Sequence, residues 1–382
     1  MLDRPFYLEQ LANAVRRSPI TALLGPRQCG KTTLARLFAQ NQPATFFDLE
    51  SQVDLRRLQN PELMLGSLTG LVVLDEIQLM PELFAVLRVL VDSPQNQTRF
   101  LILGSASPML IKNAAESLAG RVEFIELAGF DLAETGADTW QMLWQRGGYP
   151  RSFLAASDPD SLAWREGFIR TFLERDLPQL GITIAAPALR RFWTMLAHYH
   201  GQIWNATELA RSLGLADKTV RNYLDILTGA FMVRQLQPWY ENIGKRQVKA
   251  PKIFLRDAGL LHALLSIADW HNLLGHPRVG ASWEGFIIEQ VLQLVRPAEA
   301  YFWATHNGAE LDLLFFHQGR RYGVEVKFSE APSITRSMQT VLHDLNLAQL
   351  WVLHPGPHTY PVHEQITVYS IHDLTKLREQ LP

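Results

Sequence analysis

A run near the start of the chain has the residue types and spacing of a phosphate-binding loop. Gly25-Pro26-Arg27-Gln28-Cys29-Gly30-Lys31-Thr32 matches the pattern G-x-x-x-x-G-K-[ST]. Glycines let the backbone turn tightly, so that successive N–H groups point at one anion. We expect this run and Thr33 to bind a nucleoside triphosphate, with Lys31 at the β- and γ-phosphates and the Thr32 hydroxyl on Mg²⁺.

Two carboxylates end an apolar run farther along the chain. Asp75 and Glu76 follow Leu71-Val72-Val73-Leu74, and a run apolar at every position is typical of a parallel strand buried on both faces. Ligands bind at the carboxyl ends of such strands. We expect Asp75 to hold Mg²⁺ and Glu76 to act as general base for an attacking water. A kinase of small molecules does not need that base, so the pair favours ATP hydrolysis.

Two more polar residues are candidates for the same site. The predicted strand 99–107 ends in small polar residues, of which we expect Ser105 to contact the γ-phosphate or the attacking water. Ser107 and a simple serine-rich turn are the alternatives. Arg121 precedes the next predicted strand, where an arginine can stabilise transition-state charge in its own subunit or in a neighbouring one. The alternative for Arg121 is a surface ion pair with Glu123.

The last third of the chain carries a second group of charged residues. Asp312 lies in one predicted strand, and Glu325 and Lys327 lie in the next. Because side chains alternate along a strand, Glu325 and Lys327 face the same side. A carboxylate from the preceding predicted helix, Glu284 or Glu289, completes the oxygen ligands of a Mg²⁺ site that activates a water. The alternative is a surface hairpin that carries charges without chemistry.

The middle of the chain has the pattern of a helix-turn-helix. Two predicted helices, 205–213 and 217–227, are separated by a turn at Gly214, and a basic and aromatic loop, 239–246, follows as a predicted wing. The residues expected to face outward near the start of the second helix, where recognition residues lie, are Lys218, Thr219, Arg221 and Asn222. A module that packs beside other domains without touching nucleic acid is the alternative.

Charge is distributed unevenly along the chain. Residues 150–260 hold 15 Lys/Arg and 10 Asp/Glu, whereas residues 1–149 hold 13 and 16, and residues 261–382 hold 8 and 12. The basic middle indicates an anionic partner, and we expect that partner to be DNA.

The elements that must position these residues follow from apolar periodicity and from glycine and proline. Before the middle region we expect helices 5–17, 33–40 and 81–90 and strands 20–24, 44–49, 71–76, 99–107 and 122–127. From residue 161 onward, besides the helix-turn-helix, we expect helices 161–177, 187–200 and 281–294 and strands 231–236, 252–255, 300–304, 310–316 and 322–327. Four regions result, namely 1–135, 136–203, 204–258 and 259–382.

Composition is that of a globular protein. The chain has 382 residues, of which 47% are hydrophobic and 19% charged, and its length predicts two or three domains. Cys29 is the only cysteine, so an intramolecular disulfide is impossible. Because the sequence has no apolar stretch of about 18 residues and no secretory leader pattern, we expect a cytoplasmic protein with no membrane partner.

Together these motifs resemble a known group of proteins. The Gly-Pro-Arg-Gln-x-Gly-Lys-Thr loop, the run 74–78, Gly104-Ser105 and the Ala-Gly-Arg run 119–121 are similar to those of bacterial and archaeal AAA-type ATPases related to the STAND class. Further runs of that group's type are 146–150, 172–177 and 249–254. The resemblance covers the whole chain, including a C-terminal region whose role is undefined in the group.

The C-terminal charged residues also resemble a family. Asp312, Glu325 and Lys327 are similar to the motif of the PD-(D/E)XK nuclease superfamily, which implies Glu284 as the helix acid, with Glu289 as the alternative. No proline precedes Asp312, which departs from the fullest form of that motif. The fold class expected is therefore α/β: a P-loop NTPase parallel sheet, a helical and winged-helix region, and a restriction-endonuclease-like α/β domain.

The expected function is ATP binding and hydrolysis coupled to action on DNA through the winged helix and the nuclease-like domain. The alternative is a nucleotide-dependent switch or scaffold that binds a protein or DNA partner and cuts nothing. ATP and Mg²⁺ are the expected cofactors, and a homo-oligomer remains an open possibility.

Overall fold

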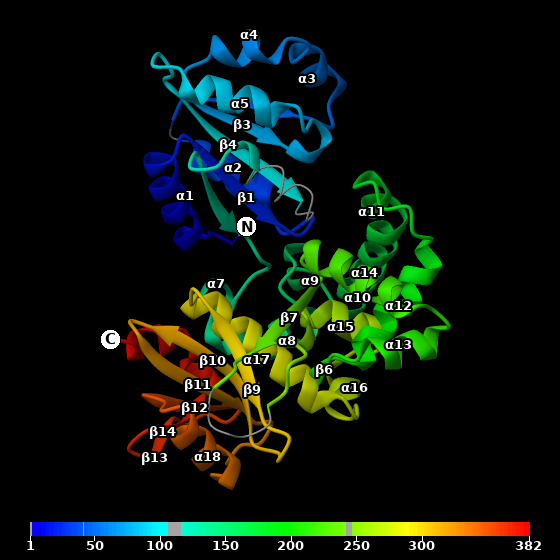
Figure 1. Ribbon diagram of the computed structural model, residues 1–382, viewed down its shortest axis with the longest axis vertical. Coiled ribbons are helices and arrows are strands. Elements are labelled where there is room, and N and C mark those ends of the chain that lie inside the picture. The colour runs from blue at the N-terminus through cyan, green and yellow to red at the C-terminus, as the bar shows by residue number, and fades with distance from the viewer. Residues whose placement is uncertain (1, 41, 106–115, 242–246) are drawn as a thin grey trace. The chain divides into compact units, whose positions relative to one another are not determined.

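The computed structural model describes residues 2–40, 42–105, 116–241 and 247–382, with Ser105 described by its backbone alone. The chain forms two compact units (Figure 1). The first unit comprises the residues up to Gly129 with Gly229–Phe231, and the second comprises Phe130–Thr228 and Met232–Pro382.

In the described part of the first unit, five parallel strands form one sheet in the order β2-β3-β4-β1-β5. The strands are β1 (Ile20–Gly25), β2 (Ala44–Asp48), β3 (Gly70–Asp75), β4 (Thr98–Ser105) and β5 (Val122–Glu126). The run 20–25 is buried throughout, as expected for an apolar strand between two parallel neighbours. The predicted parallel sheet is confirmed.

Helices cover both faces of this sheet (Figure 1). They are α1 (Pro5–Arg17), α2 (Lys31–Ala39), α3 (Gln52–Arg57), α4 (Pro61–Gly66) and α5 (Leu83–Asp92). One core cluster joins Leu11 and Leu34, from α1 and α2, to Leu23 of β1. The other joins Phe84 and Leu87 of α5 to alternate side chains of the same strands. Both faces are therefore closed by apolar contact, and the strand ends remain for polar groups.

The second unit begins with helices and ends with a sheet. The helices before the sheet region are α7 (Leu132–Thr135), α8 (Trp140–Arg146), α9 (Pro150–Phe153), α10 (Asp158–Thr171), α11 (Leu177–Gln179) and α12 (Ala186–His198). A π-helical turn, Phe172–Asp176, continues α10 to α11. Next come β6 (Gln202–Ile203), α13 (Ala206–Leu213), α14 (Asp217–Gly229), β7 (Val233–Pro238) and β8 (Lys252–Leu255).

The remaining elements complete a mixed sheet. They are α15 (Ala258–Leu264), α16 (Trp270–Leu274), α17 (Val279–Val295), β9 (Ala300–Ala304), β10 (Glu310–His317), β11 (Arg320–Val326), α18 (Arg336–Asp344), β12 (Gln349–His354), β13 (Tyr360–His363), β14 (Ile366–Ser370) and the 3-10 segment Ile371–Gln380. Antiparallel β9, β10 and β11 lead to β12, which is parallel to β11.

This sheet joins regions that the sequence pattern divides at residue 258. Among the described residues, nine strands follow the order β13-β14-β12-β11-β10-β9-β7-β8-β6. The link is a short parallel pairing in which Gln237 and Pro238 of β7 face Tyr301 and Phe302 of β9. A strand edge exposes unpaired N–H and C=O groups, and this pairing satisfies them.

A close backbone contact explains the family-type run 146–150. The Asp257 carboxylate accepts hydrogen bonds from the backbone N–H groups of Gly148 and Leu260, each at 2.8 Å. A Cβ added to Gly259 lies 2.1 Å from the Arg146 carbonyl oxygen. The runs around Arg146 and Asp257 therefore support packing within the second unit.

Gly259→Ala is expected to lower the free energy of unfolding by about 3 kcal/mol, because the new methyl group overlaps backbone that cannot move aside easily. Chemical denaturation monitored by circular dichroism measures the change. Gly167→Ala, in α10, is the control, because no atom lies within 4 Å of its added Cβ. Equal stability of Gly259→Ala and the parent chain contradicts the packing role.

Candidate functional site

The phosphate loop connects the end of β1 to the start of α2. Its turn uses left-handed backbone at Gln28, with φ of 62°, and at Gly30, with φ of 102°. Lys31 is buried, and its Nζ donates hydrogen bonds to the carbonyl oxygens of Gly25, at 3.0 Å, and Pro26, at 2.8 Å. A phosphate group can replace these carbonyls as the partner of the ammonium, which then remains at the mouth of the loop.

The acidic strand meets the loop as the sequence predicts. The Thr32 Oγ1 donates a hydrogen bond of 2.7 Å to Asp75 Oδ2. Burial raises the pKa of Asp75, while the Thr32 hydrogen bond opposes that shift. A hydroxyl and a carboxylate are hard oxygen ligands of the kind that Mg²⁺ prefers, so the residues present suit that ion.

Glu76 directly follows Asp75, and its backbone is in a turn and no longer in a strand conformation. Its φ is 56°, and its backbone N–H donates to Asp75 Oδ1 at 3.0 Å. Its side chain accepts a hydrogen bond from Gln78 Nε2. Left-handed backbone at a residue other than glycine costs free energy and is concentrated at functional sites. The geometry places a carboxylate beside the Thr32–Asp75 pair.

Ser105 ends the strand that lies between the loop strand and the acidic strand. In the sheet, β4 is flanked by β1 and β3, and Ser105 pairs with Gly25. Its backbone therefore lies at the same sheet edge as the loop. The Ser105 side chain and the alternative residue Ser107 lie outside the described part of the structure.

Arg121 lies at the opposite sheet edge, which corrects its predicted place beside the nucleotide of its own chain. Its carbonyl accepts from Ile20 N–H at the start of β1, whereas the loop follows the end of β1. Its guanidinium forms two hydrogen bonds to Asp92, at 2.7 and 2.8 Å. The alternative partner, Glu123, pairs instead with Arg17. The N-terminal and C-terminal ends of parallel strands are separated by the length of the strands. The spacing of residues in the sequence did not reveal that Arg121 lies at the N-terminal end of its strand.

The rest of the loop is held mainly by its backbone. Cys29 is buried, and Arg27 forms a 3.0 Å ion pair with Glu50. An unpredicted residue, Arg4, is buried and donates hydrogen bonds to the carbonyls of Cys29, at 3.2 Å, and Ala128, at 3.3 Å. A single arginine before a helix gave no signal in the sequence, because its partners are distant backbone carbonyls.

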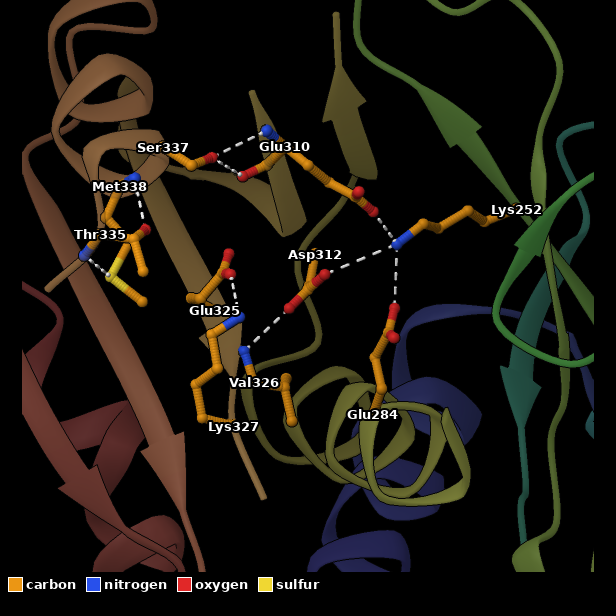
Figure 2. A network of polar contacts seen from close by, with 10 residues as sticks. All are labelled: Lys252, Glu284, Glu310, Asp312, Glu325, Val326, Lys327, Thr335, Ser337 and Met338. Carbon is orange, nitrogen blue, oxygen red and sulfur yellow. Dashed lines mark hydrogen bonds and ion pairs between the residues drawn. The ribbon is translucent and has the colours of Figure 1, made fainter. Parts of the chain in front are cut away.

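A second charged cluster lies on the mixed sheet of the second unit (Figure 2). The antiparallel pairing of β10 with β11 reaches Leu313 opposite Val324, and Asp312 and Glu325 are the next residues along the two strands. Asp312 also lies within a bulge of β10 against β9, and Asp312 Oδ2 accepts a 2.9 Å hydrogen bond from Val326 N–H. Bulges re-aim side chains next to functional sites.

The helix acid in this cluster is Glu284. Its Oε1 lies 3.0 Å from Lys252 Nζ, and the same ammonium lies 3.5 Å from Asp312 Oδ1. Glu289, the alternative, is buried elsewhere in ion pairs with Arg234 and Arg256. Helix geometry explains the choice, because five positions along a helix turn a side chain to a different face.

Lys327 pairs with Glu325 as strand alternation predicts. Its Nζ lies 2.6 Å from Glu325 Oε1, while Glu325 Oε2 is buried and has no hydrogen-bond partner among the described residues. Burial, followed by the nearby charge of Asp312, raises the pKa values of both Glu284 and Glu325. The carboxylates therefore repel one another within a largely dry site.

Lys252 is a member of the cluster that the sequence did not indicate. Its side chain comes from β8, is buried, and forms ion pairs with Glu284, Asp312 and Glu310. Burial alone lowers a lysine pKa, but these carboxylates outweigh it and raise the pKa of Lys252. Among the described residues, no group of three or more His, Cys, Asp or Glu is arranged to hold a metal ion.

The helix-turn-helix region has the predicted burial pattern. Val220, Tyr223, Leu224 and Leu227 of α14 are buried, while Lys218, Arg221 and Asn222 are exposed and Thr219 is half-buried. Gly214 makes the turn with φ of 69°. Residues 242–246 of the expected wing lie outside the described residues.

Across the described ranges, no helix combines the length and apolar content needed to cross a bilayer.

Comparison with known proteins matches three families along the chain. Residues 17–136 match the family described as AAA domain. Residues 137–271 and 279–374 match two domains of unknown function, DUF8612 and DUF4143. The solved Walker-type ATPase PABY2304 of Pyrococcus abyssi is similar in fold, with a TM-score of 0.53 and 15% identity over 69% of this chain and 96% of that one.

Two relatives are much more similar in sequence. Uncharacterized protein Rv2008c of Mycobacterium tuberculosis and uncharacterized protein Mb2031c of Mycobacterium bovis are each 53% identical over 366 residues, which is 96% of this chain and 83% of the relative. With its AAA-type P-loop ATPase domain, this chain belongs to the family of these two mycobacterial proteins.

Proposed function

We propose that the first unit binds and hydrolyses ATP with Mg²⁺. The observation that carries this proposal is the 2.7 Å hydrogen bond between Thr32 and Asp75, which brings the loop hydroxyl to the carboxylate of the acidic strand. Lys31 holds the β- and γ-phosphates, Thr32 and Asp75 hold the metal ion, and Glu76 accepts a proton from the attacking water. When bound, Mg²⁺ neutralises phosphate charge.

Phosphate release from ATP, measured with Mg²⁺ and again with excess EDTA, tests this proposal. We expect turnover in Mg²⁺ and none in EDTA. Absence of turnover under both conditions, with DNA present or absent, overturns it.

Arg121 keeps a proposed role only in a neighbouring copy. Its bidentate contact with Asp92 is exposed, and exposed ion pairs are weak, so a nucleotide phosphate of a second subunit can compete for the guanidinium. This role requires a homo-oligomer, and Ser105 remains the proposed polar contact within the chain.

The second unit is proposed to contact DNA through a winged helix. The order α12, β6, α13, α14, β7, β8 is that of a winged helix, with β8 antiparallel to both β6 and β7. The exposed side chains of Lys218, Arg221 and Asn222 lie near the start of α14, where such modules contact DNA. The excess of basic residues over 150–260 also supports this proposal.

Binding to duplex DNA is expected to weaken steeply with salt, because phosphate contacts release counterions. Replacing Lys218 and Arg221 by Gln is expected to reduce the slope of log K against log salt by about 2. Fluorescence anisotropy over a salt series measures both. Gln at Arg151 and Arg170, two exposed residues outside the module, is the control. If the chain binds neither duplex nor single-stranded nor branched DNA at low salt, the proposal is overturned and the module only packs against the rest of the chain.

The acidic cluster is proposed to be a divalent-cation site for DNA cleavage of the PD-(D/E)XK kind. The order α17, β9, β10, β11, α18, β12 and the convergence of Glu284, Asp312, Glu325 and Lys327 support it. The carboxylates would hold the cation, and Lys327 would orient an attacking water.

A second candidate function is a nucleotide-dependent switch that binds DNA or a protein and cuts nothing. The buried Lys252 ammonium among the acids favours this candidate, because it pairs with Glu284 and Asp312 without a metal ion. Incubation of assorted DNAs with Mg²⁺ or Mn²⁺, with and without ATP, separates the two functions.

A further inference from the structure

Lys252 lies where a cation would sit. Its Nζ is 3.0 Å from Glu284 Oε1 and 3.5 Å from Asp312 Oδ1, and it also pairs with Glu310. Lys252 is 4% exposed, so its ammonium is largely out of bulk solvent. Figure 2 shows Asp312 between Lys252 on one side and Glu325 with Lys327 on the other. One ammonium therefore contacts acids from the helix and from β10.

An ammonium and a divalent ion exclude each other at this point. Oxygen ligands approach Mg²⁺ to about 2.1 Å, so a metal ion held by Glu284 and Asp312 occupies nearly the same volume as the ammonium. Two cations at neighbouring positions also repel strongly where water is scarce. Glu325 Oε2, buried and without a partner among the described residues, shows that acceptor capacity remains when Lys252 is in place.

The ammonium belongs to a different part of the fold from its partners. Lys252 opens β8, and its backbone pairs with Ile203 of β6 and Leu236 of β7. The acids lie on α17 and β10. The position of the cation therefore depends on the three-stranded part of the helix-turn-helix region, while the acids depend on the nuclease-like part.

We propose that Lys252 is an autoinhibitory internal cation, which fills the metal position of the acidic cluster and admits a divalent ion only when it withdraws. This inference rests on the proposed divalent-cation site. A lysine suits the role, because a flexible four-carbon stem lets the charge leave without unfolding the strand.

Mn²⁺ binding to the full chain without nucleotide or DNA tests the proposal. Isothermal titration calorimetry and the Mn²⁺-dependent rise in melting temperature are compared for the parent chain, Lys252→Met and Lys249→Met. Lys249 is exposed, and its replacement removes the same charge from the same segment. We expect Lys252→Met to bind Mn²⁺ at least about tenfold more tightly than the parent and Lys249→Met to match the parent.

Two further variants keep the test decisive. Lys252→Gln keeps hydrogen-bond donors beside the acids and replaces Lys252→Met if the latter does not fold. Asp312→Asn combined with Lys252→Gln is expected to lose the gain in affinity, which assigns that gain to this cluster and not to Asp75. Parent-like or weaker Mn²⁺ affinity in the neutral Lys252 variants overturns the proposal.

Failure of the cleavage function gives a different result. If the neutral variants gain Mn²⁺ affinity but neither they nor the parent cut DNA, the autoinhibitory role of Lys252 is supported and the proposed cleavage function is overturned. If the parent cuts DNA and binds Mn²⁺ as tightly as Lys252→Gln, cleavage stands and the internal cation does not.

Discussion

Glu76→Gln is expected to bind ATP as tightly as the parent chain and to release phosphate at least about 100-fold more slowly. The amide has the same shape as the carboxylate but cannot accept a proton from water. Binding contacts made by Lys31 and Thr32 remain, so the loss falls on turnover. A fluorescent ATP analogue measures affinity, and steady-state phosphate release measures turnover.

Lys31→Ala provides the opposite pattern. Its ammonium is the buried cation of the loop, so its removal is expected to weaken ATP binding itself. Circular dichroism establishes that both variants fold. Turnover of Glu76→Gln equal to that of the parent removes Glu76 from the role of general base, even if Lys31→Ala behaves as expected.

Local sequence motifs predicted most of the candidate nucleotide site. A short, largely apolar strand, a glycine turn and a helix are contiguous in sequence, so their relation is fixed by local geometry. The meeting of Thr32 and Asp75 was also predictable, because the carboxyl ends of parallel strands share one sheet edge. The same reasoning placed Arg121 wrongly, because Arg121 precedes its strand and therefore lies at the N-terminal ends of the parallel strands.

Long-range pairing was not readable from the sequence. The contact of β7 with β9 joins residues about sixty positions apart, and no periodicity specifies which strand edge meets which. Lys252 has the same difficulty: in a strand it resembles any surface lysine until the acids from α17 and β10 are placed around it. Asp312 and Glu325 were predictable, because a short hairpin connects them.

Asp312→Asn is expected to reduce divalent-cation-dependent DNA cleavage by the chain at least about 100-fold. Asp312 contacts both the Val326 N–H and the ammonium of Lys252, so it is the carboxylate that links β11 to the cation position. The amide oxygen of asparagine still accepts the Val326 hydrogen bond, so the strand pairing is preserved. What disappears is the negative charge that attracts a metal ion.

The control for this prediction is Glu330→Gln, which removes one exposed carboxylate four residues beyond the end of β11. It should cut DNA at the parent's rate, and Asp312→Asn should melt within a few degrees of the parent, because Lys252 retains Glu284 and Glu310 as partners. A linear duplex, a branched duplex and a single strand are each incubated with Mg²⁺ or Mn²⁺ and with ATP. Cleavage by Asp312→Asn at the parent's rate removes this cluster from the reaction. If the parent cuts none of these DNAs under any of these conditions, the domain becomes a binding module in which Lys252 pairs with Glu284, Asp312 and Glu310.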